Sequence, residues 1–379
     1  MTSSVGARVL AEVYRLHHVP LPAITLQELL KRGPRATPAI IAKLQQDPSS
    51  LQQWKEANSP NIITSAQLLH REVPIRLARR IVDLENLPDE LPDAPSILKL
   101  REKLLSSFDE LISFPLPRSL ENEREFMKIH RRLRGEHATM HAEVSDAIKQ
   151  LSYEPQGLSE SLDNFYNSRI SIRTLVDQHL AAQEPVAGFT GIVADKCSPV
   201  QIAQSVIDKI TPGWQEEALA SGKTLPEFHI SGDKDAVYRY IPQHIELILS
   251  EVIKNAVVNS LTVSSSTPPP VSILVAGGAH GVCIKVSDLG GGMTRKQANA
   301  LFSYRQAAVA SKNQGNYDPV AAALERRASG MDFIDSFGLR IALLHAKYFG
   351  GDLSLMPMEN HGVDAYIYMN CLTGASEVK

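Results

Sequence analysis

The spacing of apolar residues changes near residue 185 of this 379-residue chain. Up to Leu180, apolar residues recur at steps of three and four, which places them along one side of a helix. Beyond residue 185, short β-branched runs joined by glycine-rich turns alternate with helical segments. The length suits two domains. We therefore predict an α+β protein, with a helical domain over residues 1–185 and a mixed domain over residues 186–379.

The first part of the chain predicts about four amphipathic helices with short connections, which is typical of an up-and-down four-helix bundle. Pro74 should kink or break the first helix, because its ring clashes and its N–H is missing. The third helix is expected to run on through His137, in an apolar seam with Leu133, Met140 and Val144. The opening 60 residues should add shorter helices outside the bundle.

The second part of the chain predicts two β-hairpins, over residues 269–288 and 352–372, with helices between and before them. A helix should begin at Pro199 with Ser198 as its N-cap. Another should end at Gly350, since glycine favours helix C-termini. These elements indicate an α/β sandwich, with helices on one face of a mixed sheet.

Composition excludes several classes of function. The formal net charge is −3, so no basic field attracts nucleic acid or an anionic membrane. Apolar runs are too short for a membrane-spanning helix, so we expect neither nucleic acid binding nor membrane insertion. The three widely spaced cysteines form neither a disulfide framework nor a zinc motif, which fits a reducing compartment. The N-terminus leaves targeting open.

The segment IELILSEVIKNAVVNS places a carboxylate and a carboxamide on one helical face. Glu251 and Asn255 are four residues apart, and Lys254 lies close to that face. A carboxylate can act as a general base, and one amide oxygen suffices for Mg²⁺, which keeps several waters. The alternative is a solvated polar face on a core helix.

Two glycine-containing segments complete a candidate ligand site. In VSDLGGGM, Asp288 ends a strand and could accept a hydrogen bond from an exocyclic amine such as that of adenine. Glycines that follow allow close approach to a ligand, although a simple hairpin exit is the alternative. In Phe337-Gly338-Leu339, a helix start offers N–H groups to phosphate. The polar stretch over residues 302–333 is either a mobile flap or a plain surface loop.

The order of these motifs resembles the GHKL nucleotide-binding fold of gyrases, ninety-kilodalton heat-shock chaperones, histidine kinases and mismatch-repair ATPases. Within it, KNA at residues 254–256, SDLGGG at 287–292 and YFGGDL at 348–353 look like the mitochondrial 2-oxoacid dehydrogenase kinases. The helical half is similar too, through LLHREVPIRLARRIVDLENLP and the segment that contains Arg169, Arg173 and His179. The resemblance spans about residues 60–372.

The resemblance implies a protein serine kinase that uses ATP and Mg²⁺. Glu251 would be the general base, Asn255 the Mg²⁺ ligand and Asp288 the partner of the adenine amine. The other implied nucleotide-binding residues are Gly290, Gly292, Phe337, Gly338 and Leu339. His137 matches a family histidine implicated in phosphoryl transfer, although a buried, hydrogen-bonded histidine remains the alternative.

The implied substrate is a serine on the E1 alpha subunit of a pyruvate or branched-chain 2-oxoacid dehydrogenase, whose phosphorylation inactivates the complex. The helical domain would be regulatory and would dock on the lipoyl domain of the E2 core. The implied location is the mitochondrial matrix, and a homodimer or heterodimer is possible.

Several positions depart from the family pattern on the phosphate side. Of the usual glycine-dense entry to the last helix only Gly338 survives, and Asp335 adds a negative charge. Val363 replaces a threonine and Val258 an arginine. The lid's hydroxyl pair is absent at residues 307–308. The alternative function is therefore a catalytically inactive pseudokinase that binds the E2 core. A bacterial-type histidine autokinase ranks last, because the helical half lacks an exposed phospho-acceptor box.

Overall fold

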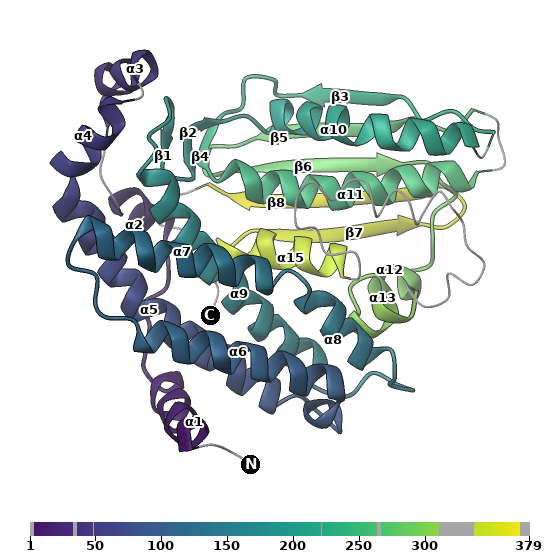
Figure 1. Ribbon diagram of the computed structural model, residues 1–379. Helices are drawn as coiled ribbons and strands as arrows, with labels where there is room; N and C mark the ends of the chain where they lie inside the picture. The colour runs from purple at the N-terminus through teal and green to yellow at the C-terminus, as the bar shows by residue number, and fades with distance from the viewer. Residues whose placement is uncertain are drawn as a thin grey trace. The chain divides into compact units, whose positions relative to one another are not determined.

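A computed structural model describes residues 4–32, 36–47, 49–220, 222–263, 267–310 and 337–371 (Figure 1). The chain forms two compact units, Met1–Asp195 and Lys196–Val378, which we call the helical unit and the α/β unit. The predictions for Asp335 and for most of the proposed flap lie outside the described residues. No helix in the described ranges is long and apolar enough to cross a membrane.

The helical unit contains the predicted bundle and the predicted short opening helices. The opening helices are α1 (Ser4–His17), α2 (Leu26–Lys31), α3 (Pro38–Gln46) and α4 (Ser50–Ala57). The bundle consists of α5 (Ser59–Glu85), α6 (Pro95–Ser113), α7 (Leu120–Glu136), α8 (Met140–Ile148) and α9 (Leu158–Ala182), with a 3₁₀ turn η1 (Leu91–Asp93). Helix α5 packs against both α6 and α9, and α8 packs against α6. Strand β1 (Phe189–Thr190) pairs antiparallel with the start of β2 (Val193–Cys197).

Two local predictions for the bundle need correction. Of the kink or break predicted at Pro74, the break is wrong, because α5 runs from Ser59 to Glu85 and buries Val73, Pro74 and Ile75. The kink stays a prediction. Burial of apolar surface along the helix outweighs the local cost of proline. The predicted third helix is divided into α7 and α8, and His137 is the C-cap of α7. The apolar spacing alone predicts that the helix continues through His137. In the structure His137 Nε2 lies 2.9 Å from the Ser107 hydroxyl on α6, and this contact holds the His137 side chain where α7 ends.

The α/β unit contains a five-stranded mixed sheet in the order β3-β5-β6-β8-β7. Its strands are β3 (Phe228–Gly232), β5 (Val271–Gly277), β6 (Gly281–Asp288), β7 (Asp352–Met358) and β8 (Gly362–Asn370). Strands β3 and β5 are parallel, and the other neighbours are antiparallel. Both predicted hairpins are confirmed, as β5–β6 and β7–β8. The parallel edge strand β3 and the short β4 (Tyr238–Tyr240) were not predicted.

Three helices of the α/β unit lie along one face of this sheet, as predicted (Figure 1). They are α10 (Pro199–Ala220), α11 (Pro242–Thr262) and α15 (Gly338–Tyr348), and the short helices α12 (Arg295–Ala300) and α13 (Tyr304–Ala310) follow β6. The backbone N–H of Gln201 reaches the Ser198 hydroxyl at 3.4 Å, which confirms the predicted cap of α10.

Alternation along β6 explains how the sheet positions its last residue. Val282, Ile284 and Val286 are buried at every second position, as expected for a strand with one covered face. Asp288 continues that series, so its carboxylate lies on the covered side, and it is only 4% exposed. In β8 the residue paired with Asp288 is Val363.

Candidate functional site

Helix α11 presents three polar side chains at four-residue intervals, Glu251, Asn255 and Asn259. Lys254 Nζ lies 2.9 Å from Glu251 Oε1, so the predicted carboxylate is held in an ion pair. Asn255 Nδ2 donates to the backbone carbonyl of Glu251 at 2.8 Å. Because its nitrogen is used inside the helix, Asn255 offers its oxygen Oδ1 to a ligand.

Asp288 receives hydrogen bonds on both carboxylate oxygens. The backbone N–H of Gly290 donates to Oδ1 at 2.9 Å, and Asn259 Nδ2 donates to Oδ2 at 3.2 Å. Burial raises the pKa of Asp288 above its usual value, while these hydrogen bonds oppose that increase. A buried, oriented carboxylate of this kind is suited to a ligand that donates hydrogen bonds.

The glycines after Asp288 seat their loop on the protein's own backbone. A Cβ on Gly290 would lie 2.5 Å from the backbone carbonyl of Asn259. Gly292 has φ +69°, and a Cβ there would overlap the carbonyl of Met358. The sequence predicted close approach to a ligand at these glycines. The close approach that the structure describes at Gly290 and Gly292 is to α11 and to the β7–β8 turn.

These elements enclose a cavity of about 320 Å³, mouth included, which is near the small end of ligand sites. Its polar lining comes from Asn255, Asn259 and Asp288. Its apolar lining comes from Val252, Ala256, Val286, Met293, Leu301, Leu339, Leu355, Val363 and Ala365. A flat apolar ring with a polar edge fits such a lining, because the walls bury the ring and Asp288 can bind its edge.

The start of α15 brings the predicted phosphate-side residues next to α11. A Cβ on Gly338 would overlap the carboxylate of Glu251, so the start of α15 lies directly against that side chain. Leu339 lines the cavity. Phe337 is 1% exposed and packs edge-on against Tyr304 at 5.1 Å, so its ring belongs to the core. Amides at this N-terminus are suited to an anion.

His137 belongs to the helical unit. Ser107 donates its hydroxyl hydrogen to the carbonyl of Lys103, so it accepts from His137 Nε2–H, and Nδ1 is the unprotonated nitrogen. Burial lowers the pKa of His137 to about 3, and the nearby cations Arg80, Lys103 and Arg169 add to that effect. The imidazole is therefore neutral at physiological pH.

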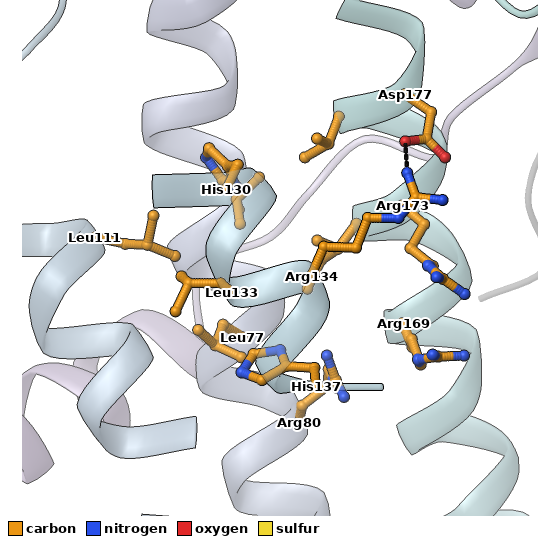
Figure 2. A pocket seen from close by; sticks show the side chains of 13 residues that line it. Leu77, Arg80, Leu111, His130, Leu133, Arg134, His137, Arg169, Arg173 and Asp177 are labelled. Atoms are coloured by element: carbon orange, nitrogen blue, oxygen red, sulfur yellow. Dashed lines mark hydrogen bonds and ion pairs between the residues drawn. The ribbon is translucent and has the colours of Figure 1, made fainter. Parts of the chain in front are cut away.

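His137 lines a cavity of about 580 Å³ in the helical bundle (Figure 2). The polar lining is mostly cationic, and Arg134 pairs with Asp177 at 2.5 Å. The lining residues that carry charge or an imidazole are Arg80, His130, Arg134, His137, Arg169, Arg173 and Asp177. Guanidinium groups bind carboxylate and phosphate well, so a lining of this composition is suited to an anion.

One polar residue of the α/β site was missed by the sequence analysis, Asn259. It follows Asn255 by four residues, as Asn255 follows Glu251, and that repeat was the available signal. His141 is buried in the bundle, and His130 is also buried and lines the bundle cavity.

A mixed sheet covered by helices on one face, with the aspartate at a strand end and the carboxylate–carboxamide helix, defines the GHKL class of ATP-binding fold. A family described as mitochondrial branched-chain alpha-ketoacid dehydrogenase kinase matches residues 24–194. The chain is also similar to a mitochondrial [pyruvate dehydrogenase (acetyl-transferring)] kinase of Arabidopsis thaliana. They are 32% identical over 327 residues, which cover 84% of this chain and 87% of the plant protein.

Two mammalian kinases are more distant. Isozyme 3 of Homo sapiens is 28% identical over 353 residues, 87% of this chain and 84% of the human one. Isozyme 4 of Mus musculus is 28% identical over 365 residues, 90% of this chain and 85% of the mouse one. All three relatives are named as mitochondrial pyruvate dehydrogenase kinases. The chain belongs to the family of mitochondrial pyruvate and branched-chain 2-oxoacid dehydrogenase kinases.

Proposed function

We propose that this chain is a mitochondrial protein serine kinase that uses MgATP to phosphorylate and inactivate the E1 alpha subunit of a 2-oxoacid dehydrogenase complex. The observation that carries the proposal is that α11, the end of β6 and the start of α15 bring Asn255, Asp288 and Leu339 around one cavity. Glu251, one helical turn before Asn255, lies against Gly338 at the start of α15. The names of the relatives support a dehydrogenase complex as the target. We further propose the lipoyl domain of the E2 core as the docking partner of the helical unit, and the matrix as the location.

The residues around the cavity fit adenine and Mg²⁺ in their chemistry. Asp288 is a buried acceptor among apolar walls, which suits a ring with an exocyclic amine. Asn255 presents an amide oxygen, which is a hard donor of the kind Mg²⁺ prefers. The described residues contain no group of three or more acidic, histidine or cysteine side chains that could hold a metal ion. A Mg²⁺ ion that completes its shell with phosphates and water needs no such cluster.

Each residue then has a defined task. Asp288 binds and orients the base, and Asn255 supplies one metal ligand, while Mg²⁺ when bound neutralises phosphate charge. Glu251, held by Lys254, accepts the proton of the substrate serine hydroxyl. Gly338 and Leu339 place the N-terminus of α15 beside that carboxylate, where its amides are suited to phosphate oxygens. Phosphoryl transfer depends chiefly on such positioning and charge neutralisation.

The second candidate function is a pseudokinase that binds the E2 core without catalysis. It is favoured by the sequence departures on the phosphate side, above all the carboxylate of Asp335, which lies outside the described residues. Like charges about 4 Å apart cost on the order of 1 kcal/mol in water and more when shielded from it. The two functions differ in whether ATP binds and whether phosphate is transferred.

A transfer assay separates the two functions. Purified full-length protein is mixed with labelled MgATP and dephosphorylated E1 bound to E2, and incorporation into E1 alpha is measured. Glu251→Gln should lower the transfer rate by about 10²–10⁴-fold, which is the usual contribution of a general base. Asn255→Ala should lower it through loss of the metal ligand.

Glu246→Gln is the matched control, because Glu246 lies on the same helix and pairs with Lys209. It should leave transfer unchanged. Incorporation that survives Glu251→Gln would contradict the assigned base. Tight E2 binding by a protein that binds no ATP would instead establish the pseudokinase.

A further inference from the structure

The carboxamide of Asn259 is the side chain that connects α11 to the base-binding aspartate. We propose that Asn259 is a positioning residue that sets nucleobase specificity. It orients the Asp288 carboxylate to accept a hydrogen bond from an exocyclic amine, and so disfavours a base that carries a carbonyl oxygen at that position. This inference rests on the proposed function, because it concerns the same cavity. The proposed role of Asn259 concerns which base is bound, whereas Glu251 and Asn255 are assigned to proton transfer and Mg²⁺ binding.

The backbone N–H of Val363 on β8 acts on the Asp288 carboxylate, and two further donors each bind one of its oxygens. Asn259 Nδ2 on α11 reaches Oδ2 at 3.2 Å, and the Gly290 N–H in the loop after β6 reaches Oδ1 at 2.9 Å. A carboxylate held at both oxygens cannot rotate without breaking a hydrogen bond. Loss of Asn259 would leave Oδ2 without that restraint.

The chemistry of the pair also fixes the orientation of the amide. An ionised carboxylate only accepts hydrogen bonds, so Asn259 must turn its NH₂ group toward Asp288. The amide thereby favours the ionised form of the carboxylate, which the like charge of Asp364 and burial oppose. Asn259 and Asp288 both line the cavity, so the pair acts where the base would bind.

Backbone packing places Asn259 beside the second donor as well. A Cβ on Gly290 would lie 2.5 Å from the carbonyl carbon of Asn259. The loop that supplies the Gly290 N–H therefore rests directly on the residue that supplies the other donor. Asn259 thus holds the carboxylate through its side chain and supports the loop through its backbone.

The two common classes of purine differ at the atom that meets this carboxylate. A 6-amino purine offers N–H donors to it, whereas a 6-oxo purine presents an acceptor and leaves both groups unsatisfied. A site built to bind one polar group discriminates strongly against an analogue that lacks it. A carboxyl group freed from Asn259 can rotate or take a proton, and a protonated carboxyl can donate to a 6-oxo group. Without Asn259 the preference should therefore fall.

The proposal is tested by titration calorimetry on the full-length protein. The affinities for ATP and for inosine triphosphate, each with Mg²⁺, are measured, and their ratio is compared between variants. Wild-type protein should prefer ATP by on the order of 10²-fold, which is the upper cost of leaving a buried polar group unsatisfied. Asn259→Ala should reduce that ratio by about tenfold. Asn259→Leu keeps about the side-chain size and removes the NH₂ donor without adding charge, so it should reduce the ratio similarly. Thr211→Ala is the control, because Thr211 bonds to the Ile207 carbonyl within α10 and does not line the cavity.

The outcomes separate this proposal from the proposed function. Wild-type protein that binds neither nucleotide would overturn both. Wild-type protein that prefers ATP, together with variants that keep the full ratio, would overturn only the role of Asn259. Variants that weaken ATP and inosine triphosphate equally would overturn it too, because a purely structural role changes both affinities and leaves their ratio. Trp214 fluorescence, from a buried residue of the same unit, identifies variants that have folded.

Discussion

The two units bury charged side chains in different ways. The helical unit buries Glu72, Arg76, Arg80, Glu123 and Arg169 within its bundle. In the described part of the α/β unit, Asp288 is the only buried residue among the aspartates, glutamates, lysines and arginines. The helical unit therefore buries several charged side chains among its helices, whereas the α/β unit buries one carboxylate, at the wall of a cavity.

The difference shows which polar groups hold a fold together and which are suited to a ligand. Glu72 and Glu123 interact with side chains of their own unit. For example, the His179 imidazole nitrogen Nε2 lies 3.0 Å from Glu123 Oε1. Asp288 is likewise hydrogen-bonded, but it lines an opening with Asn255. We therefore expect substitutions of buried charges to destabilise the helical unit and substitutions around Asp288 to alter ligand binding. Each unit contains one of the two tryptophans, Trp54 and Trp214, so their unfolding can be followed separately.

The largest effect is expected for Glu72→Ala. Glu72 is 1% exposed and pairs with Arg76 at 3.0 Å and with Arg32 at 3.5 Å. Removing the acid leaves buried guanidinium charge without this partner, which typically costs about 3–5 kcal/mol. Urea unfolding of the Trp214→Phe protein, followed by Trp54 fluorescence, measures the loss in the helical unit.

The matched control is Glu125→Ala, because Glu125 forms an exposed pair with Lys128 at 2.7 Å. Exposed pairs contribute little to stability, so this change should cost much less. Equal losses for the two variants would contradict the distinction between buried and exposed charge in this unit.

The next effect compares two adjacent glycines of the α/β unit. Gly291 and Gly292 have φ +85° and +69°, so alanine at either costs about 1–2 kcal/mol from backbone conformation. Only at Gly292 would the new Cβ also overlap the Met358 carbonyl, which should add about 1–3 kcal/mol as for overpacking. Unfolding followed by Trp214 in the Trp54→Phe protein measures the difference. Equal stability of the two variants would contradict the close approach to Met358.

The sequence predicted the parts of the site that depend on local periodicity. Glu251 and Asn255 share a face because a helix repeats every 3.6 residues. The sequence predicted that Asp288 ends a strand, and the structure shows that alternation along β6 turns its side chain toward the helices. The placement of these residues followed from patterns within single elements.

The parts that the sequence did not predict depend on contacts between distant elements. The bond from Asn259 to Asp288 joins residues 29 positions apart, and its existence depends on how α11 packs on β6. The end of α7 at Glu136 is marked by a contact of His137 with Ser107, 30 positions earlier, although the apolar spacing continues past it. Only the packing of the folded chain determines such contacts.

A smaller effect concerns the acid response of the helical unit. His137 has a pKa of about 3 in the folded protein, against 6.5 for the free side chain. Between these values the unfolded chain binds a proton that the folded chain does not, so stability falls as pH falls through 6.5. One such histidine costs about 1.4 kcal/mol between pH 7.5 and 5.5. His137→Gln keeps an N–H for Ser107 and should remove that part of the pH dependence, as measured by Trp54.

The same variant tests the two roles predicted for His137. A catalytic imidazole implies a fall of about 10²-fold or more in phosphate transfer, whereas a packing role predicts transfer close to that of the wild type. The Trp214 signal should be unchanged between the variant and the wild type. An unchanged pH dependence of Trp54 unfolding would contradict the part-buried, neutral state of His137.

The smallest effect compares two helix starts of the same design, one in each unit. Thr25 and Glu28 form a capping box at α2, and Thr294 and Gln297 form one at α12. Each threonine accepts a hydrogen bond from the third helical N–H, so Thr25→Ala and Thr294→Ala should each cost about 1 kcal/mol in their own unit. Unfolding followed by Trp54 or Trp214, respectively, measures these losses.

The two caps should differ in their effect on the nucleotide. Met293 and Leu301, on either side of α12, line the cavity with Asp288. A frayed α12 loosens that wall, and if the full 1 kcal/mol were lost from the bound state, ATP affinity would fall about fivefold. Thr25→Ala should leave ATP affinity unchanged, because α2 belongs to the other unit and contributes no residue to the cavity lining. Equal ATP affinities in the two variants would mean that the wall near α12 does not contact the nucleotide, and the binding site would then be confined to α11, β6 and the start of α15.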